Sequence, residues 1–269
     1  MKIEDKALEI IKMGSPIAGA LTGTALSFLT DNQVSLLAAS GVGAQLPIII
    51  NDFAERFLSK REKVKIGALE AFTIYKIKQN LDQQKLVNPK FTGLENSSLS
   101  ITELYEGVLI KAKNEFEEKK IEHLAYVFGN SLFDERVSPS DANHILNFAS
   151  NLSYRKLCMI SFFNRKREFL DIRLLPNPFL WYENAQFSLE TMIISQDMFE
   201  LREQGILSAG KNNNLLASDK THLTPAEMQL SPIGSLYYNI LELGLIEKED
   251  ILPIAKELEY RTEYGNSRY

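Results

Sequence analysis

The feature that most constrains this chain is a long N-terminal run with almost no charge. From Met13 to Asn51 the only charged residue is Asp31. Charged residues make up 24% of the 269-residue chain, so the run differs strongly from the rest. It consists of two apolar stretches, Pro16 to Leu29 and Val34 to Ile50, joined by a short polar turn. This pattern predicts an apolar helical hairpin.

Small residues are the second distinguishing property of the hairpin. Gly19, Gly23 and Ser27 recur at every fourth position, which places them on one face of a helix. Such faces let two helix backbones approach closely, both in lipid and in a tightly packed hairpin in water. We therefore assign membrane or subunit contact to the whole set, which also includes Asp31, Gly41, Gly43 and Pro47.

Two interpretations of the hairpin stay open at this stage. The two stretches reach about 21 and 26 Å at 1.5 Å per residue, which is short of a hydrocarbon core about 30 Å thick. A hairpin buried in the core or at a subunit interface agrees with these lengths. A hairpin that enters a membrane also agrees if Asp31 stays among the headgroups, since at the bilayer centre this residue costs roughly 2.5 to 3.5 kcal/mol. Acids precede the run and no cleavage site closes it, so we do not expect a signal peptide.

The residues after the hairpin predict a long amphipathic helix with a positive charge. We expect this helix from Asp52 to Gln84. Between Asp52 and Lys90, nine Lys or Arg residues stand against five acids. A basic patch beside an apolar segment is attracted to anionic lipid, whereas a solvated helix face is the alternative. The patch consists of Lys60, Arg61, Lys63 and Lys65.

Capping signals predict the helices that follow. Ser100 and Glu103 form a capping box before one expected helix from Ile101 to about Phe133, with Phe116 on its apolar side. The run from Glu115 to Glu122 alternates in charge, and we expect it to form ion pairs on a wet surface. Further helices are expected at residues 140–150 after Ser138-Pro139, from Ser153 onward, and from Ser188 to a C-cap glycine at Gly205.

The order of elements after Ser188 is typical of a winged helix-turn-helix module. Short apolar pairs at 206–207 and 215–216 flank a turn at 210–214, and Ser231-Pro232 begins a last helix that ends near Gly244. The two pairs would form the wing. The helix before Gly205 carries one base against four acids, so nucleic-acid binding is not expected, although residues 155–173 contain six bases against two acids.

Together these patterns predict a mainly α fold. We expect a helical bundle with an N-terminal apolar helical hairpin and a winged-helix-like C-terminal module with a small β wing. The expected domains are the lead-in and hairpin at 1–51, a long-helix bundle at 52–138, the winged-helix-like module at 139–246, and an acidic tail at 247–269.

The reactive residues exclude several classes of function. One cysteine excludes an intramolecular disulfide, and together with three scattered histidines it excludes the usual structural zinc sites. Cys158 stands among apolar residues and is expected to be a buried small hydrophobe. We find no set of nucleophile, base and orienting group and no nucleotide motif, so we expect no enzyme, no metal site and no cofactor. The formal charge of −5 provides no global attraction for nucleic acid.

Residues 103–244 resemble the Abi-alpha family of bacterial proteins. The resemblance rests on four segments: EEKKIEHLAYVFGNSLF, NFASNLSYRKLCMISFF, LREQGIL and LSPIGSLYYNIL. The uncharged N-terminal run departs from the family pattern. The resemblance implies abortive infection, a response in which an infected bacterium dies or stops growing before phage matures. It implies neither a biochemical mechanism nor catalytic residues.

From the hairpin and this resemblance we expect a non-enzymatic antiviral effector whose hairpin perturbs or enters the inner membrane. Its expected partners are membrane lipid or further copies of the chain in a homo-oligomer, together with a protein encoded nearby. Its expected location is the cytoplasm, at the periphery of the inner membrane or inserted in it. Two alternatives stay open: a soluble oligomeric interaction module with the hairpin at a subunit interface, and a winged-helix regulator that binds nucleic acid.

Overall fold

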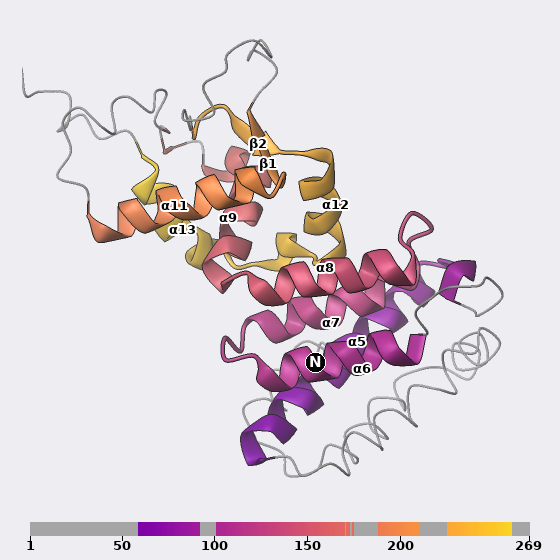
Figure 1. Ribbon diagram of the computed structural model, residues 1–269. Coiled ribbons are helices and arrows are strands. Elements are labelled where there is room, and N and C mark those ends of the chain that lie inside the picture. Colours follow the sequence, from indigo (N-terminus) through magenta and orange to yellow (C-terminus); the bar gives the residue numbers. More distant parts are fainter. Residues whose placement is uncertain are drawn as a thin grey trace, which may run out of the picture. The chain divides into compact units, whose positions relative to one another are not determined.

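The computed structural model describes residues 59–91, 101–169, 171–172, 174, 188–209 and 225–259, without the side chains of Lys60 and Ala209. These residues form helices and one two-stranded antiparallel sheet, so the mainly α prediction is confirmed (Figure 1). The predicted hairpin lies outside the described residues. The chain divides between Leu152 and Ser153 into two compact units.

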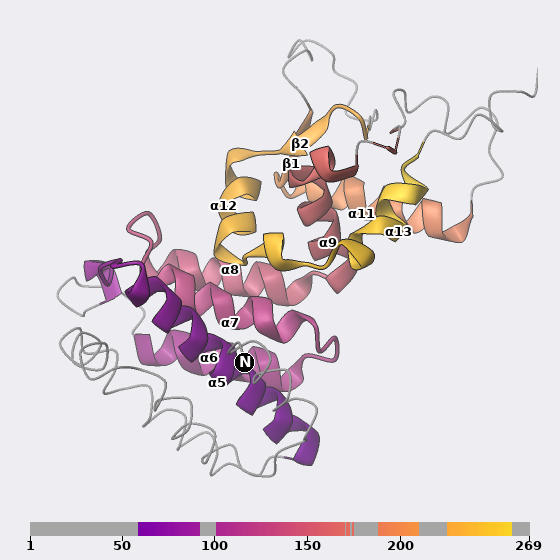
Figure 2. The ribbon, with the colours of Figure 1, turned by 180° about the vertical axis from the view of Figure 1, so that it is seen from behind.

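The first unit contains a bundle of helices in which α7 is central. Helices α5, α6 and α8 all pack against α7, and α5 crosses α6 and α7 on the face seen in Figure 2. The rings of Tyr105 and Phe128 meet in the core with their centroids 4.6 Å apart. The elements are α5 (Lys60–Asp82), the 3-10 turn η1 (Pro89–Phe91), α6 (Ile101–Asn114), α7 (Lys120–Ser131) and α8 (Pro139–Asn151).

Serine residues begin five of the helices. In each case the serine hydroxyl accepts a hydrogen bond from a backbone N–H of the first turn, which would otherwise have no partner within the helix. The predicted starts at Ser138, Ser153 and Ser188 are confirmed. Helix α5 begins at Lys60 rather than at Asp52, since Ser59 and Glu62 form a capping box.

The single helix expected from Ile101 to Phe133 is wrong, because the chain turns between α6 and α7. The Glu115 carboxylate accepts hydrogen bonds from the backbone N–H groups of Phe116 (2.9 Å) and Glu117 (3.0 Å), which forms a local turn. Phe116 lies in this turn and is 78% exposed, against the prediction that it is buried. The other apolar residues predicted for this helix are buried: Leu104, Val108, Ala112, Leu124, Phe128 and Leu132.

Helix α9 is the central element of the second unit. It contacts α11, β2, α12, η3 and α13 (Figure 1). Its residue Cys158 is buried, as expected. The elements are α9 (Tyr154–Asn164), η2 (Lys166–Phe169), α11 (Leu189–Glu203), β1 (Leu207–Ala209), β2 (Met228–Leu230), α12 (Pro232–Ile240), η3 (Leu243–Leu245) and α13 (Lys248–Glu257).

The small sheet joins the strand that follows α11 to the strand that precedes α12. Strand β1 follows Gly205, whose φ of 74° confirms it as the glycine that ends α11. β1 pairs antiparallel with β2, so that Leu207 lies opposite Leu230. The expected strand at 215–216 lies outside the described residues. Helix α12 starts at Pro232 as predicted but ends at Ile240 rather than near Gly244.

The boundaries of the second unit differ from those expected at 138/139 and 246/247. Helix α8 packs against α6 and α7, so the division falls after this helix. The segment expected as an acidic tail contains α13, whose apolar residues pack against α9 and α11. Ile251, Ile254, Ala255 and Leu258 are all buried. The apolar spacing of these residues outweighs the acidic composition of the segment.

The capping box of α8 makes stability depend on pH. Hydrogen bonds from the Ser138 hydroxyl (2.6 Å) and N–H (2.9 Å) hold the pKa of Asp141 below its usual value. A lowered carboxylate pKa contributes stability above the ordinary pKa of about 4, and this contribution is lost as the pH falls toward the folded value. We expect Asp141→Asn to lower the free energy of unfolding by about 0.5 to 1 kcal/mol at pH 7 and by progressively less as the pH falls below about 4.

Urea unfolding of both proteins, followed by circular dichroism from pH 7 to pH 3, measures this difference. Asp171→Asn, at an exposed residue of the second unit, is the control. A difference between Asp141→Asn and the original chain that stays constant over this range would contradict the assignment.

A search of the helices in the described ranges finds none with the length and apolar character that crossing a bilayer requires.

Candidate functional site

The predicted membrane or subunit residues fall in two groups. Gly19, Gly23, Ser27, Asp31, Gly41, Gly43 and Pro47 lie outside the described residues. The basic patch lies at the start of α5, where its members have different surroundings. Arg61 is exposed and pairs with Glu118 at 3.2 Å, and Lys63 is half-buried. Lys65 is buried and donates to the backbone carbonyls of Lys113 and Glu115, so it does not contribute to an exposed patch.

Lys65 belongs to a buried ionic cluster that joins the helices of the first unit. The Nζ atom of Lys120 lies 2.6 Å from the Glu115 carboxylate, and both side chains are at most 5% exposed. The same Nζ atom donates to the Ser150 carbonyl at the end of α8 (3.1 Å). The prediction that these charges lie on a wet surface is wrong for Glu115 and Lys120. The ion pair is buried because the turn at Glu115 directs the carboxylate inward.

A second buried polar group lies between α5 and α6. The hydroxyl of the fully buried Tyr105 is near Thr73 and the carboxylate of Glu70. Burial raises the pKa of Tyr105, and the charge of Glu70 raises it further. The phenol therefore stays protonated throughout the physiological range of pH.

In the second unit, ion pairs join α9 to the inward side of α11. Arg155 Nε lies 2.6 Å from the Asp197 carboxylate, whose side chain is 8% exposed. Lys156 pairs with Glu200 and lies 3.6 Å from Asp197. Hydrogen bonding from Lys156 holds the pKa of Glu200 below its usual value. Two of the acids in α11 thus fix the orientation of the helix against α9.

Other cations of the 155–173 stretch are also held within the unit. Arg165 pairs with Glu168 (2.8 Å) and donates to the carbonyl of Ile246 (2.6 Å). Lys166 donates to the carbonyls of Ala226 (3.0 Å) and Met228 (2.5 Å) at the start of β2. Residues 155–173 were the basic segment that could have bound nucleic acid. Arg165 and Lys166 of this segment instead join elements within the second unit.

A small cavity lies beside Lys166. Its volume is about 270 Å³, and most of its lining is apolar. Burial lowers the pKa of Lys166. The cavity is smaller than the usual range for small-molecule sites, which is about 300 to 1,000 Å³, and the ammonium already serves two carbonyls. The lining residues are Phe162, Lys166, Arg167, Phe169, Ile172, Leu174 and Ala226.

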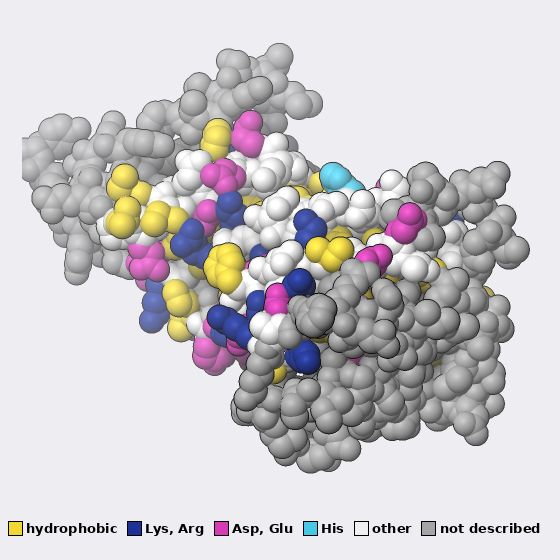
Figure 3. Space-filling view, turned by 60° about the horizontal axis from the view of Figure 1, so that its bottom comes forward, with side chains coloured by type: hydrophobic (Ala, Val, Ile, Leu, Met, Phe, Trp, Pro, Cys, Tyr) yellow, Lys and Arg dark blue, Asp and Glu magenta, His cyan; other side chains and the backbone are white. Residues whose placement is uncertain are grey.

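The outward face of α11 is the most apolar exposed feature of a single described element. Leu189, Met192 and Phe199 are 73%, 56% and 37% exposed. Figure 3 shows exposed hydrophobic side chains among charged ones on one face of the molecule. This face was not predicted from the sequence, although its residues are spaced along one side of a helix. The remaining exposed large hydrophobic residues of the described ranges occur singly, in separate elements or loops: Leu86, Ile110, Phe116, Ile233 and Leu245.

Two segments that carry the family resemblance are in direct contact. The turn of LREQGIL packs on the start of LSPIGSLYYNIL, where the Ser231 N–H donates to the Ile206 carbonyl (2.9 Å). The Ser231 hydroxyl donates to the Gly205 carbonyl and accepts from the Gly234 N–H. A Cβ atom on Gly234 would lie 2.2 Å from the Ile206 oxygen, so glycine is required for this approach.

The ion pairs and carbonyl contacts described above join elements within each unit. The buried side chains of Lys65, Glu115 and Lys120 in the first unit and of Asp197 in the second face oppositely charged groups or backbone carbonyls. The outward face of α11 is the described surface best suited to contact another molecule. Comparison of the chain with models of known protein families, with curated proteins and with solved structures finds no match in any of the three.

Proposed function

We propose that this protein is a non-enzymatic bacterial effector of the abortive-infection type, in which the N-terminal hairpin acts on the inner membrane. The observation that carries the proposal is the run from Met13 to Asn51, with Asp31 as its single charge, ahead of a charged helical body. The described body supports a scaffold role, because its buried charges are fixed in ion pairs that tie helices together. The resemblance of residues 103–244 to the Abi-alpha family supports the antiviral assignment.

Dye release from vesicles tests this proposal. The full purified chain is added to vesicles of phosphatidylethanolamine and phosphatidylglycerol and, separately, to vesicles of phosphatidylcholine. We expect release from the anionic vesicles and a loss of about tenfold in the Gly19→Leu/Gly23→Leu variant, since bulky side chains block close helix approach. Ala25→Leu adds the same bulk away from the small-residue face and is the matched control.

Leakage that is equal in the double variant and in the control would remove the small-residue face from the mechanism. Complete absence of leakage, together with absence of the protein from the membrane fraction of cells, would overturn the proposal.

A soluble oligomer with the hairpin at a subunit interface is the second candidate. The observation that favours it is the placement of Lys65, which is buried, and of Arg61, which pairs with Glu118. Both placements reduce the positive charge that α5 offers to lipid. Gel filtration with light scattering separates the candidates, because a buried hairpin predicts a stable oligomer without detergent. The nucleic-acid alternative is disfavoured because Arg155 and Lys156 pair with the acids of α11, which reduces the positive charge available to phosphate groups.

A further inference from the structure

We propose that the cavity beside Lys166 binds a small carboxylate that carries an aliphatic chain. We call it the η2 cavity, since η2 supplies Lys166, Arg167 and Phe169, and define it by the seven lining residues given above. All of them belong to the second unit. The η2 cavity therefore lies apart from the hairpin in the sequence, and its ligand is independent of the proposed membrane action.

The apolar part of the η2 cavity is fixed by contacts within the unit. The rings of Phe162 on α9 and Phe169 on η2 meet edge to face with centroids 5.6 Å apart, and both residues are buried. The Ile172 N–H donates to the Phe169 carbonyl (3.0 Å), and Leu174 pairs with Glu259 in an isolated antiparallel bridge. A cavity that is formed before the ligand arrives lowers the entropy cost of binding.

Lys166 brings a partly desolvated ammonium group to the η2 cavity. The side chain is half-buried, and burial lowers its pKa because part of its water has been removed. Its Nζ atom donates to the carbonyls of Ala226 (3.0 Å) and Met228 (2.5 Å) at the start of β2. An ammonium has three N–H groups, so these two contacts leave one for a ligand. A carboxylate is a stronger partner for such a group than a neutral acceptor.

Arg167 is the second cation of the η2 cavity. It is exposed and forms no ion pair with the described residues of the chain. The neighbouring carboxylate of Glu168 is held by Arg165 at 2.8 Å, and none of the lining residues is acidic. The planar guanidinium fork matches the two oxygens of a carboxylate. Two cations without an acid in the lining therefore select a ligand with a negative head group.

The volume of the η2 cavity determines the size of the ligand. About 270 Å³ is below the usual range for drug-sized ligands, which is about 300 to 1,000 Å³. At about 30 Å³ per non-hydrogen atom, the share of one water molecule in the liquid, the cavity holds about nine such atoms, close to the size of octanoate. A nucleotide is too large for this space, and inorganic phosphate would leave the apolar lining uncovered. An aliphatic carboxylate satisfies both the lining and the cations.

Isothermal titration calorimetry with the full purified chain tests the proposal. The probes are octanoate, octanol and octylamine, which share one chain length and differ in the charge of the head group. We expect octanoate to bind with a dissociation constant of about 10 µM to 1 mM. Octanol should bind about tenfold more weakly, and octylamine should not bind, because its ammonium would meet Lys166 and Arg167.

The length of the aliphatic chain provides a second test. Each methylene that enters the apolar lining should strengthen binding about threefold to fourfold, so hexanoate should bind about tenfold more weakly than octanoate. Dodecanoate should gain little over octanoate, since the cavity holds about nine non-hydrogen atoms.

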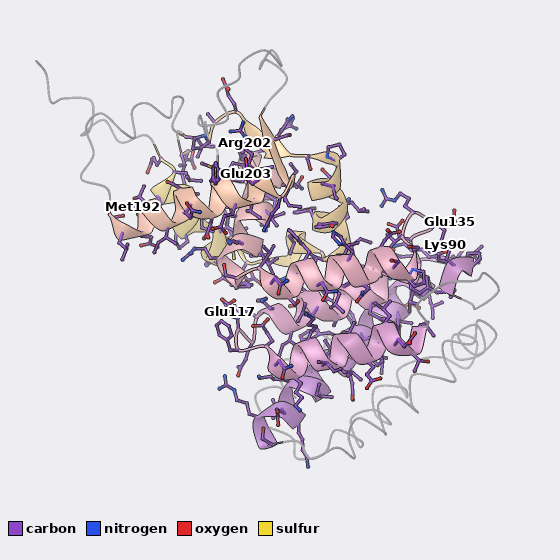
Figure 4. All side chains as sticks on the ribbon, viewed as in Figure 1. Lys90, Glu117, Glu135, Met192, Arg202 and Glu203 are labelled. Atoms are coloured by element: carbon purple, nitrogen blue, oxygen red, sulfur yellow. The ribbon has the colours of Figure 1, made fainter. Side chains whose placement is uncertain are left out.

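Arg167→Gln tests the assignment of the head group. It should weaken the binding of octanoate about fivefold to tenfold and leave that of octanol unchanged, because only the carboxylate meets the guanidinium. Arg202→Gln is the matched control and should change neither affinity. Arg202 lies in the last turn of α11, as labelled in Figure 4, and does not line the cavity.

Leu174→Asn tests the assignment of the aliphatic chain. It replaces an apolar lining side chain by a polar one of similar size, so it should weaken octanoate and octanol alike, by about tenfold. Leu245→Asn, at a residue of η3 that is 48% exposed and does not line the cavity, is the matched control.

Three results would overturn the proposal. The first is equal affinity for octanoate and octanol, or binding of neither. The second is unchanged octanoate binding by both Arg167→Gln and Leu174→Asn. The third is an affinity that rises by the same factor per carbon as far as dodecanoate, which would show adsorption to an open surface. Calorimetry and leakage are separate measurements, so failure here leaves the test of membrane action intact.

Discussion

Gly234→Ala is expected to lower the free energy of unfolding of the second unit by about 3 kcal/mol or more. The added Cβ would lie 2.2 Å from the carbonyl oxygen of Ile206, which is a backbone atom. This carbonyl also accepts a hydrogen bond from Ser231, so it cannot move away without cost. Either the turn after α11 or the first turn of α12 must therefore shift.

Urea unfolding followed by circular dichroism measures the loss, and hydrogen exchange of α11 and α12 assigns it to the second unit. Gly244→Ala is the matched control, because its Cβ would meet the hydroxyl end of the Tyr238 side chain at 2.8 Å. A side-chain end can move, so we expect a loss of about 1 kcal/mol or less there. Equal stability of the two variants would contradict the close packing of the two segments.

Lys120→Met is expected to lower the free energy of unfolding by about 3 to 5 kcal/mol. The substitution leaves the Glu115 carboxylate buried without the ammonium that lies 2.6 Å from it. It also leaves the Ser150 carbonyl without this donor. The double variant Glu115→Gln/Lys120→Met should recover most of the loss, because the glutamine oxygen still accepts from the backbone N–H groups of the turn and no carboxylate is left buried without its ammonium.

Unfolding of the two single variants and the double variant forms a double-mutant cycle that isolates the pair energy. Arg61→Gln is the control, since its ion pair with Glu118 has side chains that are 67% and 58% exposed. Exposed pairs contribute about 0 to 1 kcal/mol. A loss in Lys120→Met no larger than that in Arg61→Gln would show that the pair is not buried in solution.

Local signals predicted the helix starts well because the chemistry of a cap lies within a few residues. Ser138 with Pro139, Ser153, Ser188 and Ser231 all begin helices at the expected positions. Gly205 ends α11 as expected because the left-handed backbone there favours glycine. Each of these features is determined by neighbours in the sequence.

The turn between α6 and α7 was missed for the opposite reason. Helical propensity favours a continuous helix through Glu115, and the carboxylate forms the turn only with Lys120 and the end of α8 in place. The burial of Lys65 likewise depends on carbonyls 48 and 50 residues further along the chain. Such non-local partners leave no periodic pattern in the sequence.

The ends of α11 could be predicted from the sequence, but the side of this helix that faces outward could not. Ser188 and Gly205 define α11, yet apolar residues occur on two sides of this helix. The pairing of Asp197 with Arg155 determines which side turns inward. The side that carries Met192 and Phe199 is outward only because α9 occupies the other.

The central position of α9 also determines when the second unit can fold during synthesis. The described elements that pack most closely on it follow it in the chain, and the Tyr154 hydroxyl donates to Asp250, 96 residues later. As the ribosome releases the chain, α9 emerges with its apolar side uncovered and stays so until α13 has been made. The described helices of the first unit, α5 to α8, lie earlier in the chain and can complete their packing in that interval, so α9 keeps its apolar side exposed to aggregation and to chaperones for longer than they do.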